Sequence, residues 1–228
     1  DVPYLVTSND ESYELLTGPA GDLMTEKCIA ETGLKPLYYG IIGMRQFTNS
    51  KHEIVTPDDL KGLKIRAQNN SVQVKGLSAF GCSISTMSFS EVFTSLQQGT
   101  IDGQENPIET LYNFQYYDVQ DYVTISNHLC TAGAVVCNNA WYEGLSDEFK
   151  AAVDKAAQVA EAYSIEELNS SESEVLSLLA EKMQVTELTE EQLAAFQDVA
   201  KTAWPELVDE IGSDYMNEFL TAAGISMN

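Results

Sequence analysis

The sequence predicts an α/β fold with largely parallel sheets, and three observations support this prediction. Short stretches rich in β-forming residues alternate with helical stretches of about ten residues, as in strands joined by crossover helices. The chain has 228 residues, of which 44% are hydrophobic, so it can bury a substantial core. Helix-start and helix-stop signals separate the two kinds of segment. In folds of this class, ligands bind beyond the carboxyl ends of the strands.

The first half of the chain opens with helix and then alternates between strand and helix. A helix is expected from about Ser8 to Thr32, interrupted at Gly18-Pro19 and stopped by Gly33. The strands expected in this half are Leu34 to Tyr39, Leu63 to Arg66, Ser83 to Met87 and Ile101 to Asn106. The helices expected here are Ser71 to Phe80, a helix after Ser88 that stops at Gly99, and a helix opened by Pro107.

Capping signals mark several helix starts. In Thr56-Pro57-Asp58-Asp59, Thr is the N-cap, Pro lies in the first turn, and the acids lie near the positive end of the helix dipole. Ser88 to Glu91 and Thr189 to Gln192 are capping boxes. The remaining expected elements are a β-rich segment from Tyr122 to Val136, an acidic helix from Ser146 to about Met183, and a helical C-terminus broken at Trp204-Pro205.

The chain is strongly acidic, with a formal net charge of −23. Residues 1–142 carry 16 acidic and 8 basic residues, net −8, whereas residues 143–228 carry 19 and 4, net −15. A polyanion without a basic patch is a poor candidate for binding nucleic acid or an anionic membrane, so no nucleic acid is expected as a partner. We interpret the acidic C-terminal part as a solvated helical surface.

Only two of the 12 basic residues are arginines, Arg45 and Arg66. Arginine differs from lysine because its planar fork matches a carboxylate through two hydrogen bonds. Arg66 stands at the carboxyl end of an expected strand, and Asn106 stands at the end of another, where α/β folds bind ligands. Two interpretations stay open: the arginines bind a ligand carboxylate, or they form ordinary structural ion pairs.

Sequence signatures of catalysis are absent. The chain has no G-x-S-x-G elbow, no P-loop, no G-x-G-x-x-G and no H-E-x-x-H. Its histidines, His52 and His128, have no partner at metal-ligand spacing, and His128 is interpreted as a hydrogen-bonded strand-end residue, with a ligand contact as the alternative. The side chains of Asp102 and Glu105 are expected to diverge. We therefore expect no enzyme activity, no catalytic residues, no metal and no cofactor.

The four cysteines are Cys28, Cys82, Cys130 and Cys137, and none form a C-x-x-C pair. If Cys130 and Cys137 share one extended strand, seven steps of about 3.3 Å place them more than about 20 Å apart. A disulfide needs α-carbons about 4.4–6.8 Å apart. Free thiols are therefore expected, although a turn at Gly133 would allow a bridge.

Between Gly43 and His128, several motifs in order resemble those of TRAP-type (tripartite ATP-independent periplasmic) transporter solute-binding proteins of the dicarboxylate-receptor type. Gly43 to Thr48 (GMRQFT) resembles the family's G-x-R strand, and Thr56 to Arg66 (TPDDLKGLKIR) is similar to its most distinctive stretch. The other similar segments are Met87 to Val92 (MSFSEV), Leu96 to Pro107 (LQQGTIDGQENP) and Asn127-His128.

The resemblance implies ligand-binding roles for five residues. Arg66 would bind the ligand carboxylate, Asn106 would donate to the same group, and Arg45 would assist. Asn69 and Phe89 would line the pocket, although Phe89 is equally compatible with a place in the core. The segment around Asn69 is more polar than what usually follows the family's arginine.

The resemblance also implies a two-lobed fold of the periplasmic-binding-protein type, with a hinged cleft and a long helix that spans both lobes. In the family, the segment similar to Asp1 to Leu5 (DVPYL) lies inside the first lobe, so the fold is expected to be N-terminally incomplete. The expected boundaries are the remainder of lobe 1 at 1–35, mainly lobe 2 with crossing strands at 36–125, a return toward lobe 1 at 126–145, the long helix at 146–183 and a C-terminal helical segment at 184–228.

The function implied is capture of a small organic acid, a carboxylate or sugar acid, outside the cytoplasm. The acid would be delivered to the TRAP permease subunits in the membrane, and the full-length receptor would be a monomer. The expected location is periplasmic or extracellular-facing, with a membrane tether if the protein is a lipoprotein. The alternatives are an ABC-type binding protein or sensor domain, or an enzyme acting on organic acids.

Overall fold

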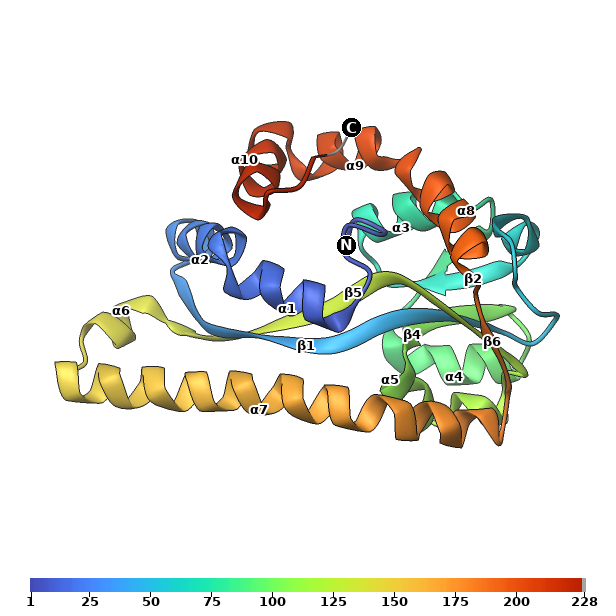
Figure 1. Ribbon diagram of the computed structural model, residues 1–228, viewed down its shortest axis with the longest axis horizontal. Coiled ribbons are helices and arrows are strands. Elements are labelled where there is room, and N and C mark those ends of the chain that lie inside the picture. Colours follow the sequence, from blue (N-terminus) through green and yellow to red (C-terminus); the bar gives the residue numbers. More distant parts are fainter. Residues whose placement is uncertain (227–228) are drawn as a thin grey trace.

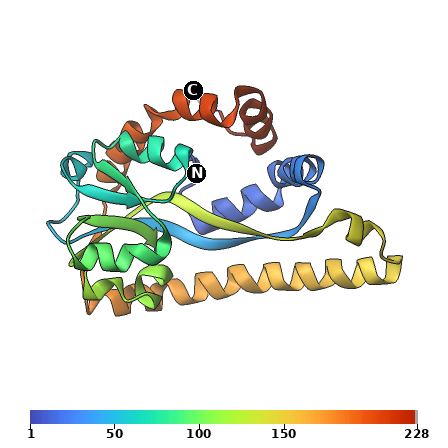
Figure 2. The ribbon, with the colours of Figure 1, turned by 180° about the vertical axis from the view of Figure 1, so that it is seen from behind.

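The computed structural model describes residues 1–226, which form a mixed α/β fold (Figures 1 and 2). The strands are β1 (Leu34–Asn49), β2 (Lys64–Ala67), β3 (Ser83–Thr86), β4 (Gly103–Pro107), β5 (Tyr122–Asn138) and β6 (Gln184–Glu187). The α-helices are α1 (Asn9–Thr17), α2 (Pro19–Thr32), α3 (Ser71–Ser78), α4 (Phe89–Gln97), α5 (Ile108–Asn113), α6 (Asn139–Glu143), α7 (Asp147–Ala180), α8 (Glu190–Lys201), α9 (Trp204–Ile211) and α10 (Ser213–Ala223). The short 3-10 helices are η1 (Pro57–Leu60) and η2 (Tyr116–Asp118).

The described strands form one six-stranded sheet in the order β3-β2-β4-β1-β5-β6. β2 is parallel to β3 and β4, and β5 is parallel to β6. β1, in contrast, is antiparallel to both β4 and β5. The prediction of a largely parallel sheet is therefore wrong for the longest ladder. The chain crosses from the outer end of the ladder to its inner end along β1 and returns to the outer end along β5, so these two strands run in opposite directions.

The ladder between β1 and β5 extends well beyond the rest of the sheet (Figure 1). It pairs Leu34 with Asn138 at its outer end and Asn49 with Tyr122 at its inner end. β4 pairs with β1 only over Arg45–Asn49, so the outer part of the ladder has α1, α2 and α7 as its neighbours instead of strands. The ladder therefore connects the sheet to a second, mostly helical part of the molecule.

β1 is much longer than the sequence predicts, because the prediction ended at Tyr39. Gly40 and Gly43 interrupt the β-forming pattern there. Gly43 has φ +135° and lies where the register of the ladder shifts. Glycine adopts this conformation readily, so the residue that hides the strand in the sequence also allows the strand to continue.

Helices cover both faces of the sheet with separate hydrophobic cores. α3 and α8 cover one face, and this core includes Phe47, Ile65, Leu77 and Phe196. α4, α5 and the end of α7 cover the other, and this core includes Val92, Leu111, Val123 and Leu179. Each fully buried side chain of this size contributes about 1.5–3 kcal/mol. The two cores hold the carboxyl ends of β2 and β4 rigidly between them.

Helix α7 runs beneath the whole ladder and ends below the sheet (Figure 1). Its 34 residues correspond to a length of about 51 Å. Ser146 caps its start as predicted, but the helix ends at Ala180 and not near Met183. The sequence prediction missed β6, which follows at once, because four residues with one apolar side chain between helical segments carry almost no strand signal. Residues 227 and 228 of the predicted C-terminal segment lie outside the described residues.

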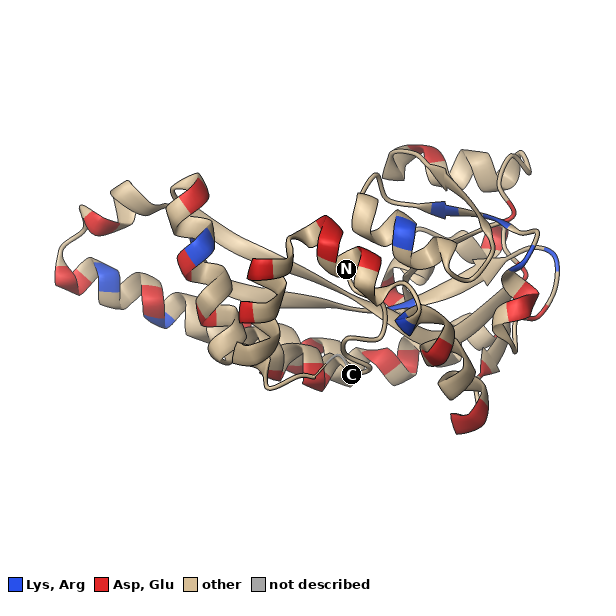
Figure 3. Ribbon diagram, turned by 90° about the horizontal axis from the view of Figure 1, so that it is seen from above, with Lys and Arg blue, Asp and Glu red and all other residues tan. Residues whose placement is uncertain are grey.

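Acidic positions are frequent along α7 and the C-terminal helices and also occur on α1, on α2 and around the sheet, whereas most basic positions lie around the sheet (Figure 3). No helix among residues 1–226 is both long and apolar enough to cross a bilayer. All four cysteines are free, as predicted, and Cys130 and Cys137 lie on the single strand β5.

Candidate functional site

The strand register shows which way Arg66 points. Arg66 is in register with Gln104 of β4, and Gln104 is in register with Thr48 of β1. Thr48 is in register with Val123, which packs under α4 and α5. Residues in register share a face of the sheet, so Arg66 points toward α4 and α5.

The guanidinium of Arg66 is buried with only part of its hydrogen-bonding capacity used. The residue is 3% exposed. Its Nε and Nη2 donate to the backbone oxygen of Met87, at 3.3 and 2.9 Å, whereas Nη1 is buried without a partner among the described residues. Burial lowers the pKa of Arg66, and the charge of Glu105 opposes that change. A buried donor left unpaired costs about 1–3 kcal/mol, so an acceptor brought to Nη1 would relieve a real penalty.

A cavity of about 540 Å³ lies beside Arg66. Its walls come from the turn after β2 and the turn between β3 and α4, both of which follow the carboxyl ends of parallel strands. The lining residues are Arg66, Gln68, Asn69, Met87, Ser88 and Phe89. Three of the five predicted site residues, Arg66, Asn69 and Phe89, are thus brought together.

Phe89 belongs to the cavity wall and is not enclosed in the core. Its side chain is 38% exposed, and its ring meets that of Phe114 edge to face, with centroids 4.7 Å apart. Phe114, 54% exposed, precedes Gln115, whose φ of +54° is unusual for a residue other than glycine. Sequence reasoning missed Phe114, because an aromatic residue at a helix end carries no signal of where it points.

Asn106 lies close to this region but does not line the cavity. It is two residues beyond Gln104 on β4, so it shares the face of Arg66 and lies further toward the carboxyl end. Its Nδ2 donates to Gln104 Oε1 at 2.5 Å, and Gln104 Nε2 donates to Thr48 Oγ1 at 2.9 Å. Asn106 is therefore held by a row of amide and hydroxyl groups along the sheet.

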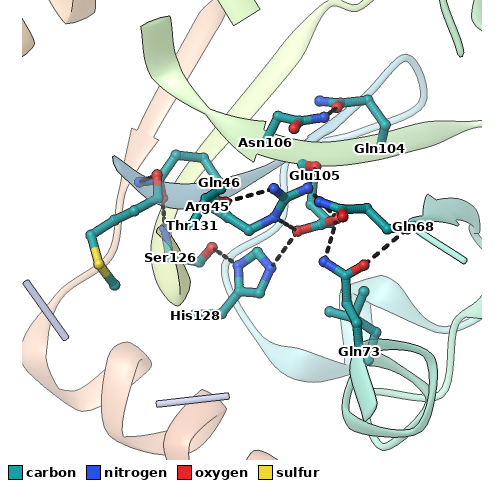
Figure 4. A network of polar contacts seen from close by, with 12 residues as sticks. Arg45, Gln46, Gln68, Gln73, Gln104, Glu105, Asn106, Ser126, His128 and Thr131 are labelled. Carbon is teal, nitrogen blue, oxygen red and sulfur yellow. Dashed lines mark hydrogen bonds and ion pairs between the residues drawn. The ribbon is translucent and has the colours of Figure 1, made fainter. Parts of the chain in front are cut away.

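Arg45 lies on the opposite face of the sheet from Arg66. It is in register with Pro107, which shares a face with Glu105 and not with Gln104. Arg45, 2% exposed, forms a buried ion pair with Glu105 (Figure 4). Nε donates to Oε2, and Nη2 donates to Oε1 at 2.7 Å. Arg45 thus has the structural ion pair that the sequence left open, while its predicted help in ligand binding stays a prediction.

Glu105 is the centre of a buried network (Figure 4). His128 Nε2 lies 3.3 Å from Oε2, and Gln73 Nε2 donates to Oε1 at 3.2 Å. Burial alone would raise the pKa of Glu105, but Arg45 and His128 outweigh it and hold the pKa below its ordinary value. Burial lowers the pKa of His128 despite its contact with Glu105. The network therefore holds an ionised carboxylate beside one permanent cation.

The network reaches the cavity through Gln73. Its Oε1 accepts a hydrogen bond from the backbone N of Gln68 at 2.9 Å, while its Nε2 binds Glu105. The turn that carries Gln68 and Asn69 is therefore fixed at its backbone from the far side of the sheet. Their side chains make no hydrogen bond among the described residues and stay available to a ligand.

His128 is hydrogen-bonded as predicted, but it lies within β5 and not at a strand end. A bulge precedes it, where Asn127 has φ +46°. Gln46 Oε1 accepts from the backbone N of Ser126 and of Asn127, at 2.8 and 2.9 Å. Ser126 Oγ lies 2.9 Å from His128 Nδ1. Gln46 therefore fixes the bulge that presents the imidazole to Glu105.

Asp102 and Glu105 diverge, as expected from their spacing. Asp102 accepts from the backbone N of Lys64 at 2.9 Å and pairs with Lys51, whereas Glu105 is buried beside Arg45. Across residues 1–226, no group of three or more His, Cys, Asp or Glu side chains is placed to hold a metal ion.

Another cavity, of about 460 Å³, lies between α1, the start of α2 and the C-terminal end of the described chain. Its described lining is mostly apolar, includes Glu11 and Glu14, and has no basic side chain. Two carboxylates disfavour an anionic ligand, so the cavity beside Arg66 is the better candidate for an acid.

Comparisons with known proteins give a family match and several relatives. A sequence model of the family described as bacterial extracellular solute-binding protein, family 7, matches residues 1–210. The chain is 37% identical over 163 residues to the 2,3-diketo-L-gulonate-binding periplasmic protein of Escherichia coli (strain K12), an alignment that covers 72% of this chain and 49% of that protein. It is 31% identical over 228 residues to the C4-dicarboxylate-binding periplasmic protein of Vibrio cholerae serotype O1, covering 97% of this chain and 67% of that protein. The chain spans about half the length of several curated relatives.

Solved structures show the same fold. One is the sugar acid binding protein of Advenella mimigardefordensis strain DPN7T in complex with galactonate. It superposes with a TM-score of 0.88 at 31% sequence identity, covering 98% of this chain and 72% of that chain. The mixed sheet, the crossing ladder and the long helix described above are therefore shared with a receptor of this kind.

Proposed function

The chain belongs to family 7 of the bacterial extracellular solute-binding proteins, and on this premise we propose that it captures a small organic acid outside the cytoplasm for a TRAP membrane permease. The observation that carries the proposal is the unpaired, buried Nη1 of Arg66 beside a cavity at the carboxyl ends of β2 and β3. The proposed ligand group is a carboxylate.

The contact with Met87 supports a two-bond grip on that carboxylate. The Met87 oxygen takes the edge of the guanidinium formed by Nε and Nη2. The other edge, formed by Nη1 and the second hydrogen of Nη2, remains free for the two oxygens of a carboxylate. Met87 thus orients the fork, which reduces the ordering cost of binding.

Asn106, Asn69 and Phe89 complete the proposed site. Asn69 and Phe89 line the cavity, while Asn106 lies further along β4 on the same face as Arg66. In this proposal Asn106 donates its second amide hydrogen to the carboxylate once the ligand is bound. Arg45 acts indirectly, because its ion pair with Glu105 anchors the turn of Gln68 and Asn69 through Gln73.

The proposed mechanism is capture and delivery, with no chemical step. Ligand contacts from both parts of the molecule would shift the population toward a closed form, which then docks on the permease subunits. The long ladder and α7 connect the two parts and would bend or pivot as they close. The proposed setting is the periplasm or the outer face of the cell membrane, with the full-length receptor acting as a monomer.

Calorimetric titration of the full-length Arg66→Lys variant tests the proposal. Lysine keeps the charge but loses the fork, and each charge-assisted hydrogen bond contributes roughly 1.5–3 kcal/mol. We expect affinity for the bound acid to fall by about two orders of magnitude or more, at about 1.4 kcal/mol per tenfold. Lys61→Arg, an exposed change between the same residue types, is the matched control and should bind normally. Unchanged affinity of Arg66→Lys with a lowered melting temperature would contradict the binding role.

A further inference from the structure

Resting on the proposed function, we propose that the captured acid is a polyhydroxylated monocarboxylate: its one carboxylate binds Arg66, and its uncharged, hydroxyl-bearing body binds Gln68 and Asn69 against the ring of Phe89. The inference comes from what the cavity offers beyond Arg66. Its described lining has one cation, two primary amides with free side chains and an exposed aromatic face.

The charge of the cavity matches one carboxylate and disfavours a second. Arg66 is the only basic residue in its described lining. Arg45 lies across the sheet and is neutralised by Glu105. Near the wall, Ser88 donates its backbone N and its hydroxyl to Glu91, and these hydrogen bonds lower the pKa of Glu91. The described lining therefore offers no cation to a second ligand carboxylate, and the carboxylate of Glu91 near the wall adds a repulsive charge.

The two free amides match hydroxyl groups. A primary amide has donors and acceptors side by side, as does a hydroxyl, whereas a carboxylate only accepts and an alkyl chain does neither. Gln68 and Asn69 are both exposed at the cavity, and Gln73 fixes the backbone of their turn. An apolar acid would desolvate these amides without replacing their bonds to water, at a cost in affinity.

The aromatic pair offers the apolar half of the site. Phe89 and Phe114 meet edge to face, and both keep exposed surface. A hydroxylated chain or ring has an apolar C–H side that packs on such a surface while its hydroxyls reach the amides.

Titration of the full-length protein with four probes tests this class of ligand. The probes are D-gluconate (one carboxylate and many hydroxyls), succinate (two carboxylates), hexanoate (one carboxylate and an alkyl chain) and D-glucose (hydroxyls without a carboxylate). We expect gluconate to bind at least about tenfold more tightly than each of the other three. Succinate or hexanoate binding as tightly as gluconate would overturn the inference and leave the proposed function standing. Glucose binding as tightly as gluconate, or no binding of any acid, would overturn both.

A double variant tests whether the amides of Gln68 and Asn69 recognise the hydroxyl groups of the ligand. Gln68→Met with Asn69→Leu keeps the side-chain size and removes the amides, and both positions are exposed, so folding should be unaffected. We expect gluconate affinity to fall by about tenfold or more, while hexanoate affinity stays equal or rises. Gln98→Met, an exposed position at the far end of α4, is the control and should leave both unchanged. An equal loss for gluconate and hexanoate, or no loss for gluconate, would contradict hydroxyl recognition by these amides.

Discussion

Arg45 and Arg66 are buried almost equally, at 2% and 3% exposure, yet their surroundings differ in kind. Arg45 has a carboxylate, a backbone oxygen and the hydroxyl of Thr131 as acceptors. Arg66 has one backbone oxygen and an unpaired Nη1. Burial alone therefore does not distinguish a structural arginine from one that we propose to bind a ligand. What distinguishes them is whether the protein itself supplies the acceptors.

Two glutamates show the same contrast for negative charges: one has partners inside the protein and the other has an oxygen without a partner. Glu105 is fully buried with Arg45, His128 and Gln73 around it. Glu109, four residues further along the chain in the first turn of α5, is partly buried, and its Oε1 has no hydrogen-bond partner among the described residues. The pKa is lowered at Glu105, whereas at Glu109 it is raised by burial and by the charge of Glu172. Measurements of stability can therefore distinguish the paired residue from the unpaired one, both for the two arginines and for the two glutamates.

The largest effect is expected from breaking the buried pair. Arg45→Met removes the guanidinium that pairs with Glu105, and removing one partner of a buried pair costs about 3–5 kcal/mol. We expect the free energy of unfolding, measured by urea denaturation, to fall by that amount. The turn of Gln68 and Asn69 should also loosen. Gln73 holds this turn through its hydrogen bond to Glu105, and in the variant Arg45 no longer holds Glu105 in place.

The control for this prediction removes both charges together. In Arg45→Met with Glu105→Leu, no uncompensated charge remains, so much of the lost stability should return. A double variant as unstable as Arg45→Met alone would show that the pair is not the source of the effect.

Arg66→Met should have a small effect on stability and a large effect on ligand affinity. Among the described residues, Arg66 has only the Met87 oxygen as an acceptor, and its Nη1 is buried without a partner. Loss of Arg66 should therefore change the free energy of unfolding by less than about 1 kcal/mol. Affinity for the acid, measured by calorimetry, should fall by more than about a hundredfold. A loss of stability as large as that of Arg45→Met would make Arg66 a structural residue as well and remove the contrast.

The sequence predicted the positions of helices and strands better than it predicted which strands pair. Capping boxes and glycine stops are local signals, so the starts of α4, α7 and α8 were predicted correctly, as was the strand that carries Arg66. The length of β1 was not predicted correctly. Its glycines interrupt the pattern of β-forming residues, but pairing with β5 keeps the strand extended.

The part of the candidate site that depends on a single distinctive residue could be predicted from the sequence. Arg66 stood out as one of two arginines and at a strand end, and it lies beside a cavity together with Asn69 and Phe89. The partner of Arg45 was not predictable, because Glu105 is 60 positions away and the register between β1 and β4 decides the contact. For the same reason the sequence left open whether each arginine forms a structural ion pair. The ligand contacts of Arg66, Asn106, Arg45, Asn69 and Phe89 stay predictions.

The smallest expected effect is a pH dependence at Glu109. An acid whose pKa is higher in the folded state binds more protons when folded, so stability falls as pH rises from the unfolded value of 4.5 through the folded one. Glu172 of α7 acts on Glu109 as a like charge and, near Asp10, also has a raised pKa, so its charge adds to this cost. Glu109→Gln has no such titration. We therefore expect its free energy of unfolding, relative to wild type, to rise between about pH 4.5 and 7.5 by roughly 0.2–1 kcal/mol, since partial exposure screens the charge. Urea denaturation at several pH values measures this difference, with Glu174→Gln on the exposed side of α7 as the control; a difference that stays flat or falls as pH rises would show that Glu109 is balanced by partners as Glu105 is.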